Sequence, residues 1–97
     1  MLDRHYAPRG ELRLFTLGGV LDVRPDRTTG ALLLGAQLSV QHAVCMPTDP
    51  AGYAQRLYAE LHRLDDLGCD LIMAERVPET PDWAGVRDRL ARAAQQP

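Results

Sequence analysis

The residues that could carry chemistry are few, and most lack the partners that their chemistry needs. Ser39 is the only serine of the 97-residue chain, and it stands in Leu-Ser-Val without the glycines of a nucleophile elbow, which argues against a serine hydrolase. His42 and Cys45 are three residues apart, and on a strand this spacing directs their side chains to opposite faces. Because no second closely spaced pair exists, we expect no metal site and a core or edge-strand role for both residues.

Two further positions are candidate ligand contacts. Gly18 and Gly19 follow a predicted strand and could bind an anion, but no helix of sufficient length follows, so a plain turn with one glycine at positive φ is the simpler interpretation. Glu75 ends another predicted strand, at the end where open α/β sheets usually bind ligands. By position it is the best pocket candidate. The alternative is a solvated carboxylate or the partner of an arginine such as Arg87 or Arg89.

The basic residues are all arginine, eleven in number, and the chain has no lysine. A Schiff base, a phosphate-loop lysine and a lysine general base are therefore excluded. Arg87, Arg89 and Arg92 cluster near the end of the chain, where nucleic-acid binding would require a basic stripe. Asp82 and Asp88 lie among them and the formal net charge is -2, so we predict a solvated helix face and no direct nucleic-acid contact.

The elements that must position these residues follow an α/β pattern. Short apolar runs predict strands at 12–15, 31–34, 40–46 and 71–75. The second of these runs is apolar throughout, as in a strand buried on both faces of a parallel sheet. Residues 17–30 contain too much glycine, proline and charge for a long helix, so we expect a loop or hairpin there. The fold class is thus α/β, a small Rossmann-like open sheet of about four strands, mostly parallel, with two clear helices.

Both helices have start and stop signals. Asp49 can cap a helix over 50–67, Pro50 suits its first position, and Gly68 can end it in the left-handed conformation. The predicted apolar stripe of this helix is Ala54, Leu57, Tyr58, Leu61 and Leu64, and its predicted water-facing residues are Gln55, Arg56, Glu60, Arg63 and Asp66. Thr80 can cap a last helix that begins at Pro81 and is expected to bury Trp83, Val86, Leu90 and Ala93.

The overall composition is that of an ordinary folded domain. We place a linker or tail segment at 1–11 and a single α/β accessory domain at 12–97. No apolar run approaches the roughly 18 residues of a membrane helix, and the start lacks a signal-peptide pattern, so we expect a cytoplasmic protein without membrane contact. Cys45 and Cys69 are too few for a disulfide framework, and both are interpreted as buried small hydrophobes.

Three segments together are similar to a known family. They are the opening Met1-Leu-Asp-Arg-His-Tyr-Ala-Pro8, the stretch 53–75, and Trp83 with Asp88-Arg-Leu-Ala-Arg-Ala-Ala94. The first resembles the interdomain linker motif His-Tyr-Ala-Pro or His-Tyr-Ser-Pro of the two-domain threonylcarbamoyl-AMP synthases. The other two resemble the helix, strand and closing helix of the C-terminal accessory domain of that family. The likeness extends over nearly the whole chain.

The resemblance implies an accessory domain without catalytic residues, for which no enzymatic activity is expected on its own. Its partner, in cis or in trans, would be the catalytic domain, an ATP-dependent nucleotidyltransferase that joins threonine, bicarbonate and ATP into threonylcarbamoyl-AMP and pyrophosphate for tRNA threonylcarbamoyladenosine biosynthesis. ATP, with magnesium as a further candidate, belongs to that parent enzyme, and no cofactor is expected here. In the family the linker closes the active site, which makes Arg4, His5 and Tyr6 the substrate-facing candidates.

Two departures from the family pattern modify these expectations. Leu2 and Asp3 stand where the family commonly has Lys-Tyr, and residues 17–30 are short where the family usually has a full crossover helix. A trimmed sheet would expose one face, which a homodimer could cover. The alternative function is a stand-alone small-ligand or nucleotide-binding sensor that uses Glu75 and the paired glycines, and a structural remnant is a third interpretation.

Overall fold

The structure, a computed structural model, describes residues 10–16, 27–35 and 40–94. It contains the strands β1 (Glu11–Phe15), β2 (Thr29–Leu33), β3 (His42–Cys45) and β4 (Leu71–Glu75). Its helices are α1 (Pro50–Asp66), the short 3-10 helix η1 (Pro81–Trp83) and α2 (Ala84–Ala94). The predicted α/β class, with four strands and two main helices, is confirmed.

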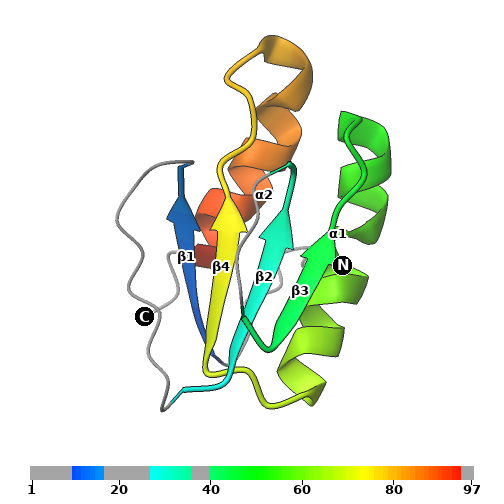
Figure 1. Ribbon diagram of the computed structural model, residues 1–97. Coiled ribbons are helices and arrows are strands. Elements are labelled where there is room, and N and C mark those ends of the chain that lie inside the picture. Colours follow the sequence, from blue (N-terminus) through cyan, green and yellow to red (C-terminus); the bar gives the residue numbers. More distant parts are fainter. Residues whose placement is uncertain (1–9, 17–26, 36–39, 95–97) are drawn as a thin grey trace, which may run out of the picture.

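The four strands form one sheet in the order β1-β4-β2-β3, and every neighbouring pair is parallel. Although β4 is the last strand in the sequence, it lies inside the sheet between β1 and β2 (Figure 1). In the register of β1 and β4, Leu12 is opposite Ile72 and Phe15 is opposite Glu75. Because all strands run the same way, their amino ends lie together at one end of the sheet, which we call the amino edge. Their carboxyl ends lie together at the opposite end, the carboxyl edge.

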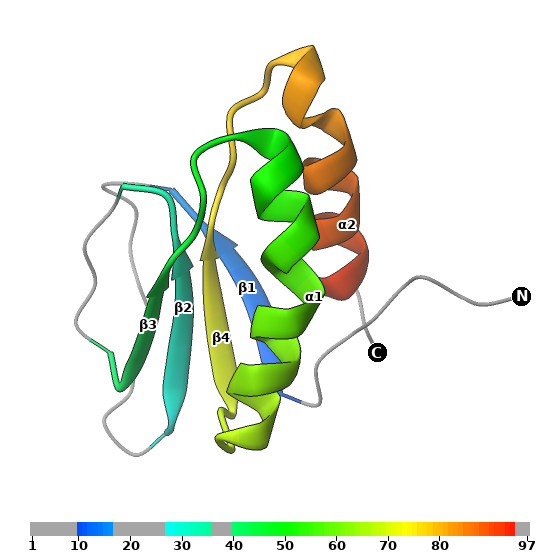
Figure 2. The ribbon, with the colours of Figure 1, turned by 90° about the vertical axis from the view of Figure 1, so that its right-hand side faces the viewer.

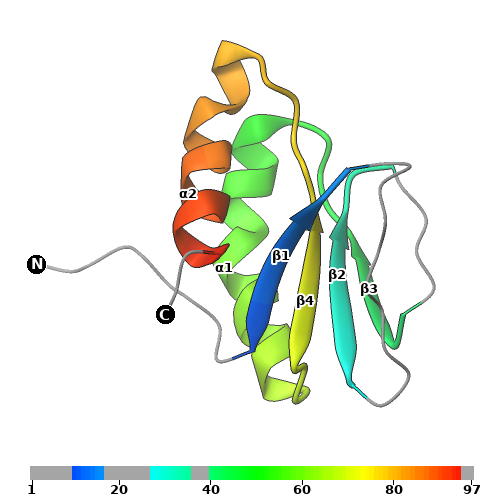
Figure 3. The same cartoon turned by 90° about the vertical axis from the view of Figure 1, so that its left-hand side faces the viewer.

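Both helices lie on the same face of the sheet. The two side views show α1 and α2 side by side against that face (Figures 2 and 3). Apolar side chains fill the space between, and the residues with no exposed surface include Leu32, Leu57, Leu61, Leu64 and Ile72. The described part of the domain therefore has two layers, helices on one side and the sheet on the other. Its Rossmann-like character stays a prediction.

A second, smaller apolar cluster lies on the other face of the sheet. It consists of Phe15, Ala31, Leu33, Leu71 and Met73, all of them buried. Successive side chains of a strand point to opposite faces, so β2 and β4 contribute to both clusters. All five residues of β2 are buried, which confirms the prediction of a strand enclosed on both faces.

Helix α1 begins and ends as its sequence predicts. The Asp49 carboxylate accepts a hydrogen bond from the Gly52 amide at 2.8 Å, which satisfies one free donor of the first turn. Gly68 follows the helix at φ +81°, a left-handed conformation that costs glycine little. The apolar stripe is correct in its leucines. It also includes Tyr53, which is fully buried, whereas Ala54 and Tyr58 are half-buried.

Glu60 corrects the predicted water-facing side of α1, because only 8% of its surface is exposed. Its two carboxylate oxygens accept hydrogen bonds from Arg56 Nη2 at 2.8 Å and from Arg63 Nε at 3.0 Å. Burial alone would raise the pKa of Glu60, but the hydrogen bonds and charges of these two arginines outweigh it and hold the pKa below its ordinary value. Paired in this way, the carboxylate can be buried without a large penalty.

Other differences from the predicted elements are small. Thr29 and Gly30, expected in a loop, are the first residues of β2, and β3 is shorter than its predicted run. Thr80 caps no helix through its side chain, and α2 is preceded by the turn of η1. Cys69 is buried as predicted, but Cys45 is exposed, because it lies on the edge strand β3. No helix in the described ranges is long and apolar enough to cross a membrane.

Candidate functional site

At the amino edge of the sheet, Gly10 leads directly into β1. Asp70, the residue before β4, is the centre of the junction of strand starts at this edge. Its main-chain oxygen accepts a hydrogen bond from the Glu11 amide at 2.9 Å, and its amide donates to the Thr28 oxygen at 2.8 Å. Asp70 thereby joins the starts of β1, β4 and β2.

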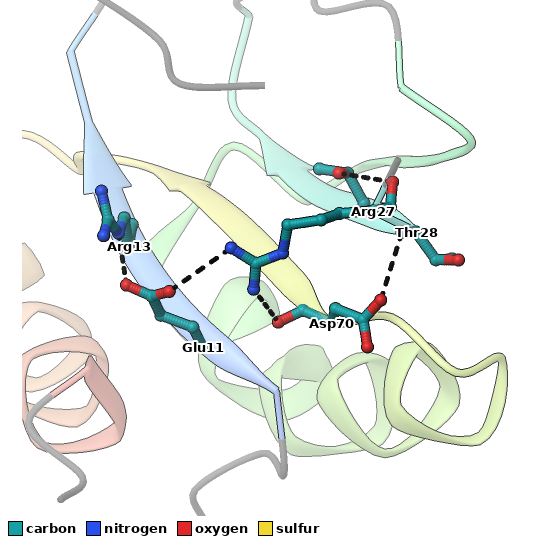
Figure 4. Close-up of polar contacts among 6 residues, drawn as sticks. Glu11, Arg13, Arg27, Thr28 and Asp70 are labelled. Atoms are coloured by element: carbon teal, nitrogen blue, oxygen red, sulfur yellow. Dashed lines mark hydrogen bonds and ion pairs between the residues drawn. The ribbon is translucent and has the colours of Figure 1, made fainter. Parts of the chain in front are cut away.

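Arg27 reinforces the same junction from the side of β2. Its Nη2 donates to the Asp70 main-chain oxygen at 3.0 Å, and its Nη1 lies 3.7 Å from the Glu11 carboxylate. Figure 4 shows the guanidinium lying between Glu11 on β1 and Asp70 at the start of β4. The Asp70 carboxylate accepts a further bond from the Thr28 amide at 3.4 Å, and Arg13 donates to Glu11. A charged side chain therefore links three strand starts that are distant in the sequence.

Gly10 packs directly against this junction. A Cβ atom placed on Gly10 would lie 2.4 Å from the Cys69 oxygen and 2.9 Å from the carbonyl carbon and oxygen of Asp70. These are backbone atoms, so they cannot turn aside as a side chain could. Only glycine, which has no Cβ atom, allows the backbone before β1 to pass so close to the backbone before β4.

The carboxyl edge of the sheet carries the predicted pocket candidate Glu75. Its Oε1 accepts a hydrogen bond from the Leu34 amide, just beyond the end of β2. The carboxylate thus joins the ends of β4 and β2. Glu75 lies at the carboxyl ends of the strands, as the sequence predicts. The hydrogen bond to Leu34 gives its carboxylate a structural role there.

Tyr53, near the start of α1, is coupled electrostatically to the same carboxylate. Its ring packs edge-on against Trp83, with 5.7 Å between the ring centroids. Its buried hydroxyl has no hydrogen-bond partner within the described residues. Burial and, to a smaller extent, the negative charge of Glu75 raise the pKa of Tyr53 well above its ordinary value. The phenol therefore stays neutral at physiological pH.

A small cavity of about 170 Å³ lies at the same edge, between α2 and the ends of β1 and β4. Its described lining consists of Leu14, Arg76, Val77, Glu79, Arg87, Leu90 and Ala91. The lining is mostly apolar, with three charged side chains. Drug-sized ligands usually occupy sites of roughly 300–1,000 Å³. A site of this size suits a smaller molecule.

The two arginines of the cavity differ in how they are held. Arg87 is half-buried, and its Nη1 donates to the main-chain oxygens of Pro78 at 2.8 Å and Thr80 at 3.0 Å. These bonds leave further N–H donors on the guanidinium. Arg76 is exposed, and within the described residues its side chain makes no hydrogen bond or ion pair. Arg87 is therefore held in place by its hydrogen bonds, whereas the guanidinium of Arg76 has no bonding partner among the described residues.

The structure covers only part of the predicted site. The linker candidates Arg4, His5 and Tyr6, and the turn candidates Gly18 and Gly19, lie outside the described residues. Glu75 is the one predicted contact that can be placed. It does not line the cavity, whereas its neighbour Arg76 does.

The sequence places His42 and Cys45 on one strand with their side chains directed to opposite faces. Both lie on β3, at positions whose side chains leave opposite faces of the sheet, His42 half-buried and Cys45 exposed. Within the described ranges no three histidine, cysteine, aspartate or glutamate side chains form a group that could hold a metal ion.

Nothing in the sequence alone singled out the junction residues Gly10, Arg27 and Asp70. An indirect signal was present, because Asp70 stands directly before the predicted strand 71–75 and Gly10 stands two residues before the predicted strand 12–15. In a parallel sheet, two strand starts come together only if the strands are neighbours. That neighbour relationship is a tertiary property, so the signal could not be interpreted from the sequence.

Together, the fold and these sites define a small α/β domain whose polar sites lie at the two ends of a parallel sheet. A family model, that of the threonylcarbamoyl-AMP synthase C-terminal domain, matches residues 1–95. The chain belongs to this family, which confirms the resemblance drawn from the sequence. A search of curated proteins and a search of solved structures each found no match. As the C-terminal domain of a two-domain synthase family, it has a catalytic domain as its expected partner.

Proposed function

We propose that the chain is a non-catalytic accessory domain that acts on the catalytic domain of a threonylcarbamoyl-AMP synthase, in cis or in trans. Its segment 1–11 would lie across the ATP and threonine site of the partner, with Arg4, His5 and Tyr6 facing the substrates. The observation that carries this proposal is the extent of the family match. The match begins at residue 1, so it includes segment 1–11 as well as the described strands and helices.

The junction at the amino edge supports this role. A segment that closes a partner's active site must leave its own domain from a defined point. Gly10 and Glu11 are held against Asp70 by close packing and a hydrogen bond of 2.9 Å, and Arg27 reinforces the contact. A fixed exit point lowers the conformational entropy that the segment loses when it binds across the partner's site.

In the proposed reaction, the chemistry belongs to the catalytic domain. That domain would join threonine, bicarbonate and ATP into threonylcarbamoyl-AMP, with release of pyrophosphate and water, and the product would supply tRNA modification. Closing such a site excludes water and holds the reactants in position, and both effects favour the forward reaction. The accessory domain needs no cofactor for this role, and the complex would work in the cytoplasm without direct contact to tRNA or membrane.

The proposal is tested by mixing the chain with a one-domain synthase and following pyrophosphate release from ATP and threonine. We expect binding and a faster rate or a lower KM for threonine. A double variant H5A/Y6A should lose the effect and keep the same thermal midpoint, whereas R92Q, on an exposed face of α2, should behave as the parent chain. No binding together with no change in rate would contradict the proposal.

A stand-alone ligand sensor is the second candidate function, and the cavity at the carboxyl edge is the observation that favours it. At about 170 Å³ the cavity is small for a nucleotide, since sites for molecules of that size are usually roughly 300 Å³ or more. Thermal unfolding with and without nucleotides separates the two functions, because a bound ligand raises the midpoint by mass action. A thermal midpoint that no nucleotide raises would contradict the nucleotide-sensor function.

A further inference from the structure

We propose that the cavity between α2 and the carboxyl ends of β1 and β4 binds a small aliphatic α-amino acid. The inference rests on the described lining residues and does not depend on the accessory role. Nothing in the family match assigns a ligand to this cavity. Three properties of the lining point to the ligand class, namely its apolar floor, its two arginines and its single carboxylate.

The apolar side chains of the lining indicate that the ligand has an apolar part. Leu14, Val77, Leu90 and Ala91 supply this apolar floor, and Val77 and Leu90 are themselves buried, so their positions are fixed by the core. An apolar surface of this kind gains little from a bare inorganic ion. It matches a ligand with a few methyl or methylene groups. The volume of about 170 Å³ limits that ligand to a small molecule.

The two arginines of the lining indicate that the ligand carries a carboxylate. Arg87 is anchored by the carbonyl oxygens of Pro78 and Thr80, and its remaining N–H donors can bind a carboxylate. Arg76 is on the rim with no partner among the described residues and adds a second positive charge. A guanidinium fork binds a carboxylate through two parallel hydrogen bonds, which orients the ligand as well as holding it.

Glu79 sets the third group. It lines the same cavity, and its carboxylate would repel a dianion such as phosphate, but it can accept hydrogen bonds from an ammonium group. A ligand with a carboxylate, an ammonium and a short apolar side chain satisfies all three parts of the lining. That combination is an α-amino acid with a small aliphatic side chain.

The test uses the whole 97-residue chain labelled with 15N and titrated with L-valine while the backbone amide shifts are recorded. We expect saturable shifts, in the millimolar range, at Val77, Leu90 and Ala91. Isovalerate, which lacks the ammonium, and L-valinamide, which lacks the carboxylate, should both bind more weakly. Because charge-assisted hydrogen bonds are the stronger ones, R76Q should weaken valine binding by about tenfold.

Controls separate this site from a loss of folding. R76Q removes a side chain with no described partner, so its thermal midpoint should stay that of the parent chain. R92Q changes an exposed arginine of α2 that does not line the cavity, and it should bind valine normally. The inference is overturned if valine produces no saturable shifts, if inorganic phosphate competes equally well, or if R76Q and R92Q bind with the same affinity. None of these results depends on a synthase, so they leave the accessory role unaffected.

Discussion

Arg27 donates a hydrogen bond to the main-chain oxygen of Asp70 over a distance of 3.0 Å, although 43 positions separate them in the chain. The same oxygen accepts the amide of Glu11. One carbonyl at the start of β4 therefore holds the starts of both neighbouring strands.

Replacing Arg27 tests the energetic importance of this contact. R27Q loses the bond to Asp70 and the charge opposite Glu11, and we expect the free energy of unfolding to fall by about 1 kcal/mol. Urea denaturation measures the change. R92Q is the matched control, because its pair with Asp88 is exposed on both sides and should contribute less than about 0.5 kcal/mol. Equal effects of the two variants would show that the Arg27 contact is an ordinary surface pair.

Two glycine-to-alanine substitutions, one expected to lower and one to raise the free energy of unfolding, test how closely β1 and β4 approach each other. G10A places a methyl group 2.4 Å from the Cys69 oxygen, so the strands must separate, and we expect a loss of about 1–3 kcal/mol. G85A, in α2, meets only the end of the Arg89 side chain at 3.7 Å and should stabilise the helix by up to about 1 kcal/mol. Thermal unfolding of both variants measures the contrast. A G10A variant as stable as the parent chain would contradict the packing described.

The buried Glu60 predicts a pH dependence with a definite sign. Its pKa in the folded protein lies below the ordinary value of 4.5, so its pairing stabilises the fold above that value, and the stabilisation is lost as the pH falls through the lower, folded pKa. E60Q should therefore cost about 1 kcal/mol at pH 7 and progressively less in acid. Urea denaturation at several pH values compares it with D88N, an exposed carboxylate. A cost of E60Q that stays constant down to the acid range would be inconsistent with the lowered pKa.

The two cysteines should differ in reactivity. Cys45 is exposed, whereas Cys69 is buried, and burial together with the charges of Asp65 and Asp70 raises the pKa of its thiol. Because the thiolate is the reactive form, iodoacetamide should modify C69S, which retains Cys45, faster than C45S, which retains Cys69. Mass spectrometry follows the reaction. The difference should disappear in urea, and a difference that persists there would not come from the fold.

The Tyr53 hydroxyl offers a test of a buried polar group. Because it has no partner among the described residues, Y53F should leave stability unchanged or raise it by up to about 1 kcal/mol. Y53A also removes the ring that packs against Trp83 and should cost about 3–5 kcal/mol. Fluorescence of Trp83, the single tryptophan, reports unfolding of both variants. A clear loss of stability in Y53F would mean that the hydroxyl has a bonding partner.

Much of the secondary structure followed from the sequence because its signals are local. Asp49, Pro50 and Gly68 define the limits of α1 within a few residues of each end, and the apolar run of β2 predicts a strand enclosed on both faces. The three segments 1–8, 53–75 and 83–94 together likewise resembled the family that the comparison shows. These features depend on residues close together in the chain, where spacing alone determines which side chains share a face.

The strand order and the sites came only from the tertiary structure. No local pattern states that β4 lies between β1 and β2, so the contacts of Gly10 and Arg27 with Asp70 could not be derived. Glu60 appears water-facing by helical period and becomes buried because two arginines neutralise it. The cavity beside Arg76 likewise exists only where α2 meets the ends of two strands. Local propensity determined the elements, whereas contacts between residues distant in the chain determined their order, and with it every site described.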